Sequence, residues 1–462
     1  MGNDRRLSSI REALAVSEMG TKPTPTFNFA GLVLQFSSPR KSHGTDYVVT
    51  LTIVDALHSK LTANIFTNTL QHLPLIRSSN NLILLINVQI KKHDGEVYAV
   101  FNKKYSSFAL FDPKTSTNTP YQASPGFDLQ SIDVSHIQSL MSLSLTYRVT
   151  IERNQYLISL QDLGRCEYFD LVCQILHVEN VGAKECVLFV WDGTDAPPLH
   201  LETNLAEEEP LPLEVEPRLL NMSILRKFPC VGTVLRVKAH VDISMHIQEM
   251  GQWVKIRNMT YEIHFGLWLG RLLPTTKLTF LPDNEQTVLE CKRTMDERGL
   301  GKDGRLPFWS NPLPALTVID SANIPYATLM DLITQAEDEI TVRCVVRIVA
   351  VSPFDAEKYR ADGRYGIILT LEDPTARIHA SLNGLDGDMF FEDCPSDALK
   401  RRKMDELLGL TLEQNTNSHR NPPWIQCCIK PDAIVDGKLT RARHPCRFER
   451  LVKEIRSFLA FD

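Results

Sequence analysis

Phe66 is the residue whose position suggests chemistry most directly. It ends a strand-like segment, LTANIF (61–66), whose alternation gives one apolar face and one face that is polar except for this ring. Exposing a large aromatic ring to water on the polar face of a strand is unfavourable unless another group covers the ring. A nucleobase is a suitable cover, because every base has a π-face and stacking contributes about 1–3 kcal/mol per base. The alternative is that Phe66 packs beneath a loop or a neighbouring domain.

Polar and basic residues lie in the turns beside this segment. Thr45 and Asp46 precede the segment expected to pair with it, and their short side chains suit hydrogen bonds to base edges. Gly-Thr-Asp is also ordinary turn chemistry. Tyr47 opens the pairing segment and is a further candidate. The basic candidates fit phosphate contacts, although each also fits a solvated hairpin tip: Arg40, Lys41, Lys91, Lys92, His93, Lys103 and Lys104.

Large rings also begin and end strand-like segments farther along the chain. Tyr168 and Phe169 are adjacent in a strand, so at most one of the two rings lies in the core. Trp191 closes the next segment, and His264 lies on a later one. The core is the usual place of a large aromatic ring, and a ligand contact is the alternative. Tyr168, Trp191 and His264 are therefore candidate contacts of a second ligand-binding block.

The segments that hold these residues are short, rich in β-formers and separated by turns, which is typical of small closed barrels. One pattern recurs in three blocks: an apolar strand, an acidic residue, a turn and a returning strand. Its copies are YVVTLTIVD (47–55), CVLFVWDGTD (186–195) and YGIILTLED (365–373). Three tandem OB-folds account for the repetition. Three unrelated hairpins are the alternative, because a strand followed by an aspartate and a turn is a common sequence pattern.

The sequence thus predicts a mostly β chain of three tandem OB-fold barrels, the third with an α-containing insertion. The expected parts are a flexible N-terminus (1–24), the first barrel (25–115), a linker with short elements (116–160), the second barrel (161–285), a linker (286–315) and the third barrel (316–462). The insertion spans about 384–423 and contains a helix capped by Ser396. Asn383 stands in the third copy where Phe66 stands in the first, so we expect the third barrel to dock a protein rather than a nucleic-acid strand.

The charge of the 462-residue chain is small and uneven. The net charge is −6. Residues 1–150 hold 14 Lys and Arg against 10 Asp and Glu, a charge of +4, and the remainder hold 36 against 46, a charge of −10. The chain therefore does not coat nucleic acid by bulk charge, and its first third is the better electrostatic candidate. Ten cysteines, mostly in apolar stretches, indicate a reducing compartment, cytosolic or nuclear. We find no membrane-spanning run or secretory signal.

Catalytic and metal-binding motifs are missing from the sequence. GxxxxGK[ST], HExxH, GxSxG and GxGxxG do not occur. The acidic cluster at 386–393 resembles a nuclease metal site, but no general base or nucleophile accompanies it. The Cys and His residues of the last third lack C-x₂₋₄-C spacing, and adjacent cysteines in IQCCIK are typical of a strand core: Cys394, Cys427, Cys428, His444 and Cys446. We expect no enzyme activity, cofactor or metal.

HGTDYVVTLTIVD (43–55), SKLTANIF (59–66) and LPLI (73–76) resemble the protection-of-telomeres family of telomere-end proteins, in a plant-like form. YFDLVCQIL, VWDGT and a closing Leu-Pro pair extend the resemblance over about 25–285, and the last third matches in arrangement only. The resemblance implies tandem OB-folds whose first two grip single-stranded, G-rich telomeric DNA and whose third docks a protein. It also implies a nuclear, telomeric location, and for plant members action with the telomerase ribonucleoprotein and the CST complex.

The resemblance assigns roles by position. Phe66 matches the base-stacking phenylalanine of the family, Asp46 the acidic residue that reads a base, and Tyr168 and Trp191 second-barrel DNA contacts. His93 stands where animal members have an aromatic residue, and the paired C-x-x-C zinc ligands of those members are absent, so no metal is implied. The leading interpretation is a DNA-binding regulator of telomere maintenance and telomerase access. The alternative is an interaction scaffold of the telomerase/CST machinery with weak or vestigial DNA binding, which the net charge favours.

Overall fold

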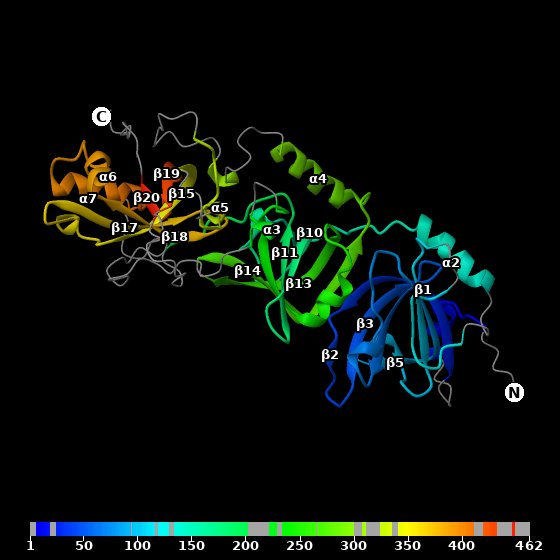
Figure 1. Cartoon of the computed structure of the whole chain (residues 1–462). Helices are drawn as coiled ribbons and strands as arrows, with labels where there is room; N and C mark the ends of the chain where they lie inside the picture. The colour runs from blue at the N-terminus through cyan, green and yellow to red at the C-terminus, as the bar shows by residue number, and fades with distance from the viewer. Residues whose placement is uncertain are drawn as a thin grey trace.

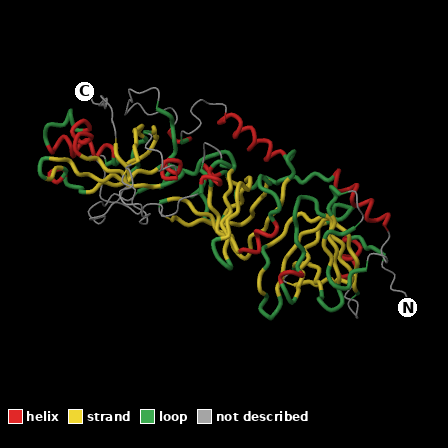
Figure 2. Tube along the Cα trace, viewed as in Figure 1, coloured by secondary structure: helices red, strands yellow, loops and turns green. Residues whose placement is uncertain are grey.

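The computed structural model describes residues 6–18, 25–93, 95–115, 119–128, 134–201, 221–228, 233–264, 266–299, 307–310, 324–334, 341–410, 419–431 and 446–448. Three β-barrels follow one another along the molecule in sequence order (Figure 1). Strands build the barrels and helices lie at their edges (Figure 2). The mostly β, three-barrel OB-fold architecture predicted from the sequence is confirmed. Within the described part of the chain, no helix has the length and apolar character of a membrane span.

The first barrel has the strand order β1-β3-β4-β6-β5 and closes by pairing of β1 with β5. Its strands are β1 (Thr26–Ser37), β3 (Tyr47–Val54), β4 (Lys60–Thr67), β5 (Leu82–His93) and β6 (Glu96–Phe101), with a short β2 (Arg40–Lys41) and η1 (Leu70–His72) in the connections. Neighbouring strands are antiparallel except β4 and β6, which are parallel. A closed Greek-key barrel of this kind is an OB-fold.

The second and third barrels repeat this order. The second contains β10 (Phe169–Asn180), β11 (Glu185–Trp191), β12 (Leu235–His240), β13 (Trp253–His264) and β14 (Leu267–Leu281), with β12 and β14 parallel. The third contains β15 (Val342–Ser352), β17 (Arg364–Glu372), β18 (Arg377–Asn383), β19 (Ile425–Pro431) and β20 (Cys446–Phe448), with β18 and β20 parallel. The parallel pair joins the third and fifth strands in every barrel, so the three blocks are copies of one fold.

Additional elements cover the barrels or fill their connections. Around the first barrel lie β7 (Ser107–Phe111), β8 (Gln122–Ala123) and α2 (Val134–Thr146), and residues of β7 and α2 form a second apolar layer against β1 and β5. The second barrel is accompanied by β9 (Leu157–Ile158), α3 (Met222–Leu225), η4 (Val241–His246) and α4 (Gln286–Gly299). The third has η6 (Ala356–Lys358), β16 (Arg360–Ala361), α6 (Gly384–Phe390) and α7 (Asp397–Leu407); η5 (Phe308–Ser310) precedes it.

A buried aspartate at the end of the second strand binds the chain entering each barrel. One carboxylate oxygen accepts the first N–H of a helix that precedes the barrel: α1 (Ile10–Glu18), η3 (Leu160–Asp162) or α5 (Leu329–Thr334). The other oxygen accepts N–H groups of the following turn. The first N–H groups of a helix have no partner within the helix, so these carboxylates act as caps. The pairs are Asp55 with Ile10 (2.8 Å), Asp192 with Leu160 (2.7 Å) and Asp373 with Leu329 (2.7 Å).

Replacing Asp192 with alanine is expected to lower the free energy of unfolding by about 3 kcal/mol, because the buried N–H groups of Leu160 and Thr194 would lose their acceptor. Urea unfolding of the full chain measures the change. Asp283→Ala is the matched control, since that carboxylate is 82% exposed. Equal unfolding midpoints for the two variants would contradict the capping role.

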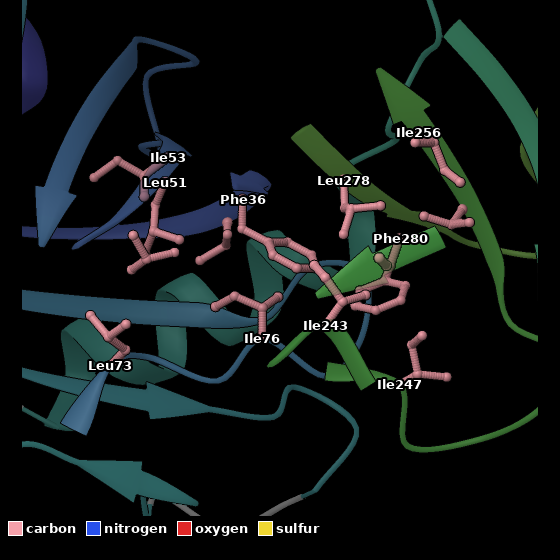
Figure 3. Close-up of a cluster of buried hydrophobic side chains, with 14 of the residues drawn as sticks. Phe36, Leu51, Ile53, Leu73, Ile76, Ile243, Ile247, Ile256, Leu278 and Phe280 are labelled. Carbon is pink, nitrogen blue, oxygen red and sulfur yellow. The ribbon is translucent and has the colours of Figure 1, made fainter. Parts of the chain in front are cut away.

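The first and second barrels share one core. β1 pairs with β14 through Phe36–Leu278 and Ser37–Lys277, which joins the two barrels into one sheet. The ring of Phe36 lies 5.4 Å from that of Phe280 and 4.6 Å from that of His246. Figure 3 shows side chains from both barrels in this cluster, with Phe36 between Leu51 on one side and the second-barrel residues on the other. The two barrels therefore pack as one unit.

His246 places a titratable group inside this shared core. Its Nδ1 lies 2.9 Å from the carbonyl oxygen of Ile76, which can only accept, so Nδ1 carries the proton. Burial lowers the pKa of His246 to about 4. The imidazole is thus neutral in the folded protein and ionises in the unfolded chain near its ordinary pKa of about 6.5.

Acidification is expected to destabilise the folded protein through His246. Between about pH 6.5 and pH 4 the unfolded chain binds the additional proton, so the free energy of unfolding falls as the pH falls. The loss from this residue between pH 7 and pH 5 is about 2 kcal/mol. Urea unfolding of the wild type and of His246→Gln at both pH values measures it. Parallel pH profiles for the two proteins would show that His246 is not responsible.

The second and third barrels meet around a buried ionic network. Arg347 is fully buried and donates to Glu372 Oε1 at 2.5 Å and to the carbonyl oxygen of Leu199 at 3.2 Å. Arg377 Nε donates to Glu372 Oε2 at 3.0 Å. Glu372 therefore lies between two guanidinium groups, one of which also binds the second barrel's backbone. A backbone bridge between Leu201 and Arg420 continues the junction.

The structure differs from several sequence-based expectations. Residues 1–24 were expected to be flexible, but Ile10–Glu18 forms α1, whose first residue is buried and capped by Asp55. The expected linker 286–315 begins with α4, which packs its Val288 against the second barrel. The helix predicted in the third-barrel insertion is present as α7, and Ser396 Oγ accepts the N–H of Leu399.

The adjacent cysteines of IQCCIK occupy a strand core, as the sequence predicted. Cys427 and Cys428 are buried in β19, and Cys394 is buried beside Asp393. Among the described residues, no group of three or more His, Cys, Asp or Glu side chains is arranged to hold a metal ion. His444 lies outside the described residues. In the acidic cluster, Asp388 pairs with Arg360, and Asp393 with Lys403 at 2.9 Å.

Candidate nucleic-acid interface

Phe66 lies on the outward face of the first barrel. On β4, Leu61, Ala63 and Ile65 are buried in the core, whereas the residues between them are half-buried. Phe66 belongs to this outward set and pairs directly with Val48 on β3. The alternation predicted for the segment is therefore present, and the ring of Phe66 stands on the opposite face from the barrel core.

The loop between β1 and β3 brings a cation into line with Phe66. Arg40 on β2 pairs with Val48, and Val48 pairs with Phe66, so the three residues form one row across three strands. Directly paired residues point to the same face, and neighbouring strands lie about 4.8 Å apart. The exposed Arg40 therefore lies about 10 Å from Phe66 on the same face. Lys41, also exposed, pairs with Tyr47 in the next row.

Asp46 is fixed in place by Lys103. Lys103 Nζ lies 2.7 Å from Asp46 Oδ1 and 2.6 Å from Asn68 Oδ1, so it connects the start of β3 with the end of β4. Thr45 Oγ1 also donates to Asp46 Oδ1, at 3.4 Å. Sequence reasoning grouped Lys103 with the phosphate contacts and missed this pairing, because residues 46 and 103 are brought together only by the closed barrel. The carboxylate of Asp46 is thus oriented at the Phe66 end of the sheet.

A second aromatic ring, not singled out from the sequence, shares the outward face. Tyr98 on β6 pairs with Thr62 on β4, and its neighbour Ala99 points into the core. Tyr98 is half-buried. Thr62 and Phe66 are four residues apart, so the rows of the two rings lie about 13 Å apart along β4. The alternation in EVYAVF (96–101) was the available signal, but only the parallel pairing of β4 with β6 identifies the shared face.

The other first-barrel candidates divide between the two faces. Lys91 is exposed and pairs with Tyr98, so it belongs to the outward face. Lys92 and His93 are exposed at the end of β5, in the hairpin with β6. Tyr47 is half-buried and packs against the core cluster, on the face opposite Phe66. The structure therefore brings Phe66, Asp46, Thr45, Arg40 and Lys91 to one side and turns Tyr47 inward. Lys41 and Lys92 pair with Tyr47 and Val97, which pack against the core, so these two lysines belong to the face opposite Phe66.

The second-barrel candidates are not brought together. Tyr168 is 48% exposed just before β10, and a hydrogen bond to Glu167 raises its pKa. His264 is exposed at the end of β13. Trp191 is only 4% exposed, lies in the core and donates from Nε1 to the carbonyl oxygen of Thr194 at 3.0 Å. The burial of Trp191 favours the core role that was its alternative.

The third barrel differs at the position of Phe66. Asn383 ends β18 and pairs with Gly366, and α6 begins at the next residue. The insertion therefore starts where the first barrel presents its aromatic ring. This barrel has no ring at that place, because a polar residue and a helix occupy it.

The three closed barrels define a tandem OB-fold protein, a class in which strand faces of this kind bind oligonucleotides or oligosaccharides. Family models agree along the chain. Residues 9–154 match "Telomeric single stranded DNA binding POT1/CDC13", residues 159–213 match "ssDNA-binding domain of telomere protection protein", and residues 312–436 match "POT1A-like, OB fold domain".

Individual relatives give the same result. The chain is 34% identical over 420 residues to protection of telomeres protein 1b of Arabidopsis thaliana, covering 87% of this chain and 89% of that protein. It is 34% identical over 426 residues to protection of telomeres protein 1a of the same plant, covering 86% and 89%. To protection of telomeres protein 1 of Homo sapiens it is 28% identical over 286 residues, covering 59% and 43%. The chain belongs to the protection of telomeres family.

Proposed function

We propose that this protein binds single-stranded, G-rich telomeric DNA on the outward face of the first barrel and is not an enzyme. The observation that carries the proposal is the row Arg40–Val48–Phe66, which puts an aromatic ring and a cation on one face of the strands that OB-folds use for ligands. Membership of the family and the match of residues 9–154 to its telomeric DNA-binding model support the same ligand.

In this mechanism the bases leave the solvent and stack on rings. One base covers Phe66, and Tyr98 offers a second platform about 13 Å along the sheet. Asp46, oriented by Lys103 and beside Thr45, accepts hydrogen bonds from a base edge. Arg40 and Lys91 lie on this face and neutralise phosphates, and Lys41, Lys92 and His93 are exposed at its edges, where they add positive charge. Stacking and edge contacts give sequence preference, while the cations give affinity.

In this proposal the bound DNA strand continues from the first barrel onto the second barrel. Tyr168 and His264 are exposed there, and they would contact a base and a phosphate. Trp191 is left out of the interface because its ring is buried. The continuous β1–β14 sheet supports a single path, since it fixes the two barrels relative to each other.

The proposed biological role follows from binding of the protein to the unpaired 3′ end of telomeric DNA. A protein that covers the tail controls whether telomerase reaches it, so we infer a nuclear regulator of telomere maintenance. The third barrel, in which a helical insertion begins at the position of Phe66, is the proposed docking site for telomerase or CST components. Residues 316–462 hold 19 Lys and Arg against 23 Asp and Glu, a charge of −4, which favours protein docking over nucleic-acid binding there.

Fluorescence anisotropy titrations of the full chain at one fixed salt concentration test the function. The probes are a G-rich telomeric repeat, a scrambled single strand of the same composition, and the duplex of the repeat. The proposal expects the telomeric strand to bind at least about tenfold more tightly than either control. Equal binding of all three would favour the second candidate, an interaction scaffold with vestigial DNA affinity.

A further inference from the structure

A cavity of about 110 Å³ lies between the second and third barrels and is lined by residues of both. Its volume is close to the roughly 150 Å³ of an engineered protein cavity that binds benzene. One aromatic ring system therefore fits, whereas a whole nucleotide does not. The cavity is partly open, so a ring attached to a chain outside can enter.

The second barrel contributes its outward strand face to this cavity. Phe189 on β11 pairs with Arg236 on β12, and both line the cavity. Their neighbours Leu188 and Val237 belong to the core, so Phe189 and Arg236 point outward. β11 and β12 are the second and third strands of their barrel, as β3 and β4 are of theirs. The cavity thus lies on the face of the second barrel that corresponds to the Phe66 face of the first.

Aromatic rings form much of the cavity wall. Phe189 packs against Phe228, with ring centroids 5.4 Å apart. Trp268 is oriented by its Nε1, which donates to the carbonyl oxygen of Pro197 at 2.7 Å. Trp424 adds a ring from the third barrel. Such π-surfaces favour a flat ligand over an aliphatic one.

The third barrel contributes carboxylates to the opposite wall. Asp331, Glu372 and Asp373 line the cavity, and Glu372 and Asp373 are each 4% exposed. A carboxylate has about four acceptor positions. Asp373 already accepts four hydrogen bonds from the protein, whereas Glu372 accepts three, so Glu372 is the carboxylate with an acceptor position left for a ligand. The barrel that holds them is fixed against the second barrel by the bond from Arg347 to Leu199. The cavity therefore combines acceptors on one wall with the guanidinium of Arg236 on the other.

We propose that this cavity takes one unpaired guanine base of the bound strand, an inference that rests on the proposed function. Guanine offers N–H donors that carboxylates accept, and O6 and N7 acceptors that arginine binds. The phosphates remain outside, because the cavity has room for one ring system and not for a whole nucleotide. A leucine or phenylalanine side chain of a protein partner would match the rings but offers nothing to the polar walls. The third barrel thereby becomes part of the DNA site.

Photo-cross-linking of the full chain tests the occupant. The probes are G-rich telomeric oligonucleotides in which one guanine at a time is replaced by 6-thioguanine, together with free 6-thioguanosine. We expect at least one substituted position to cross-link to cavity residues of the second and third barrels, identified by mass spectrometry. Cross-links confined to the first barrel would overturn this inference and leave the proposed function intact, whereas absence of any binding would overturn both. Cavity cross-links with the free nucleoside alone would overturn the strand-borne base.

Two cavity variants and one matched control complete the test. Leu267→Trp fills the cavity, and Arg236→Met removes its cation; each is expected to weaken oligonucleotide binding about fivefold or more and to abolish the cavity cross-link. Arg271→Met removes the same charge from an exposed position of β14 and should keep the cross-link. Wild-type affinity together with an intact cross-link in Leu267→Trp would overturn the inference, whatever the effect of Arg236→Met.

Discussion

Replacing Phe66 with alanine is expected to weaken binding of the full chain to a G-rich telomeric single strand by at least about tenfold. The ring stands on the outward face of β4, so its loss removes a stacking platform without opening a hole in the barrel core. The thermal midpoint should therefore change little. Anisotropy titrations at fixed salt measure the affinity, and circular dichroism melting checks the fold.

The controls separate stacking from charge and from general surface effects. Leu57→Ala removes another exposed apolar side chain, 58% accessible, in the turn that connects β3 with β4. It should leave affinity unchanged. Phe66→Trp should retain most binding, because the larger ring still stacks. The dependence of affinity on salt should be the same for Phe66→Ala and the wild type, since no phosphate contact is lost. Unchanged affinity of Phe66→Ala would remove the physical basis of the proposed interface.

Replacing Glu372 with glutamine is expected to lower the free energy of unfolding by about 3–5 kcal/mol. The carboxylate lies between Arg347 and Arg377, both nearly or fully buried, and neutralising it leaves two guanidinium groups without a counter-charge. Urea or thermal unfolding of the full chain measures the loss. We expect the transition of the third barrel to move to lower denaturant, together with its contact to Leu199.

Two further variants give this prediction a sharp contrast. Glu357→Gln makes the same chemical change at an exposed position of the third barrel and should be neutral. Arg347→Met combined with Glu372→Leu and Arg377→Met removes all three charges, and it should recover part of the stability because buried ions are costly to desolvate. A triple variant no more stable than Glu372→Gln alone would mean that packing at the junction, rather than charge balance, dominates.

Local patterns were enough to predict the strands and the class of fold. The alternation of LTANIF predicted which side chains enter the core, and the repeated acidic residue after the second strand predicted three copies of one barrel. Asp55, Asp192 and Asp373 explain why that residue recurs, since each caps the helix that precedes its barrel. The helix after Ser396 was likewise readable, because its cap is three residues from its partner.

Long-range pairings were not readable in the same way. α1 was expected to be flexible because its cap, Asp55, is 45 residues away. Tyr98 was missed because its face depends on the parallel pairing of β4 with β6. Trp191 was a candidate DNA contact, but closure of the barrel buries its ring in the core, where its Nε1 donates to the carbonyl oxygen of Thr194. In each case the deciding partner lies far away in sequence, or the face of the side chain depends on tertiary packing.

The seam between β1 and β14 has a practical consequence for anyone dividing this protein into pieces. A fragment that stops after the first barrel would expose the side chains of Phe36 and Ile76 to solvent. The carbonyl oxygen of Ile76, which accepts the hydrogen bond from His246 in the full chain, would also be exposed. Such a fragment would self-associate through this uncovered patch. DNA-binding constants measured on such a fragment would be affected by the exposed patch. The smallest fragment suitable for DNA-binding measurements therefore contains both N-terminal barrels.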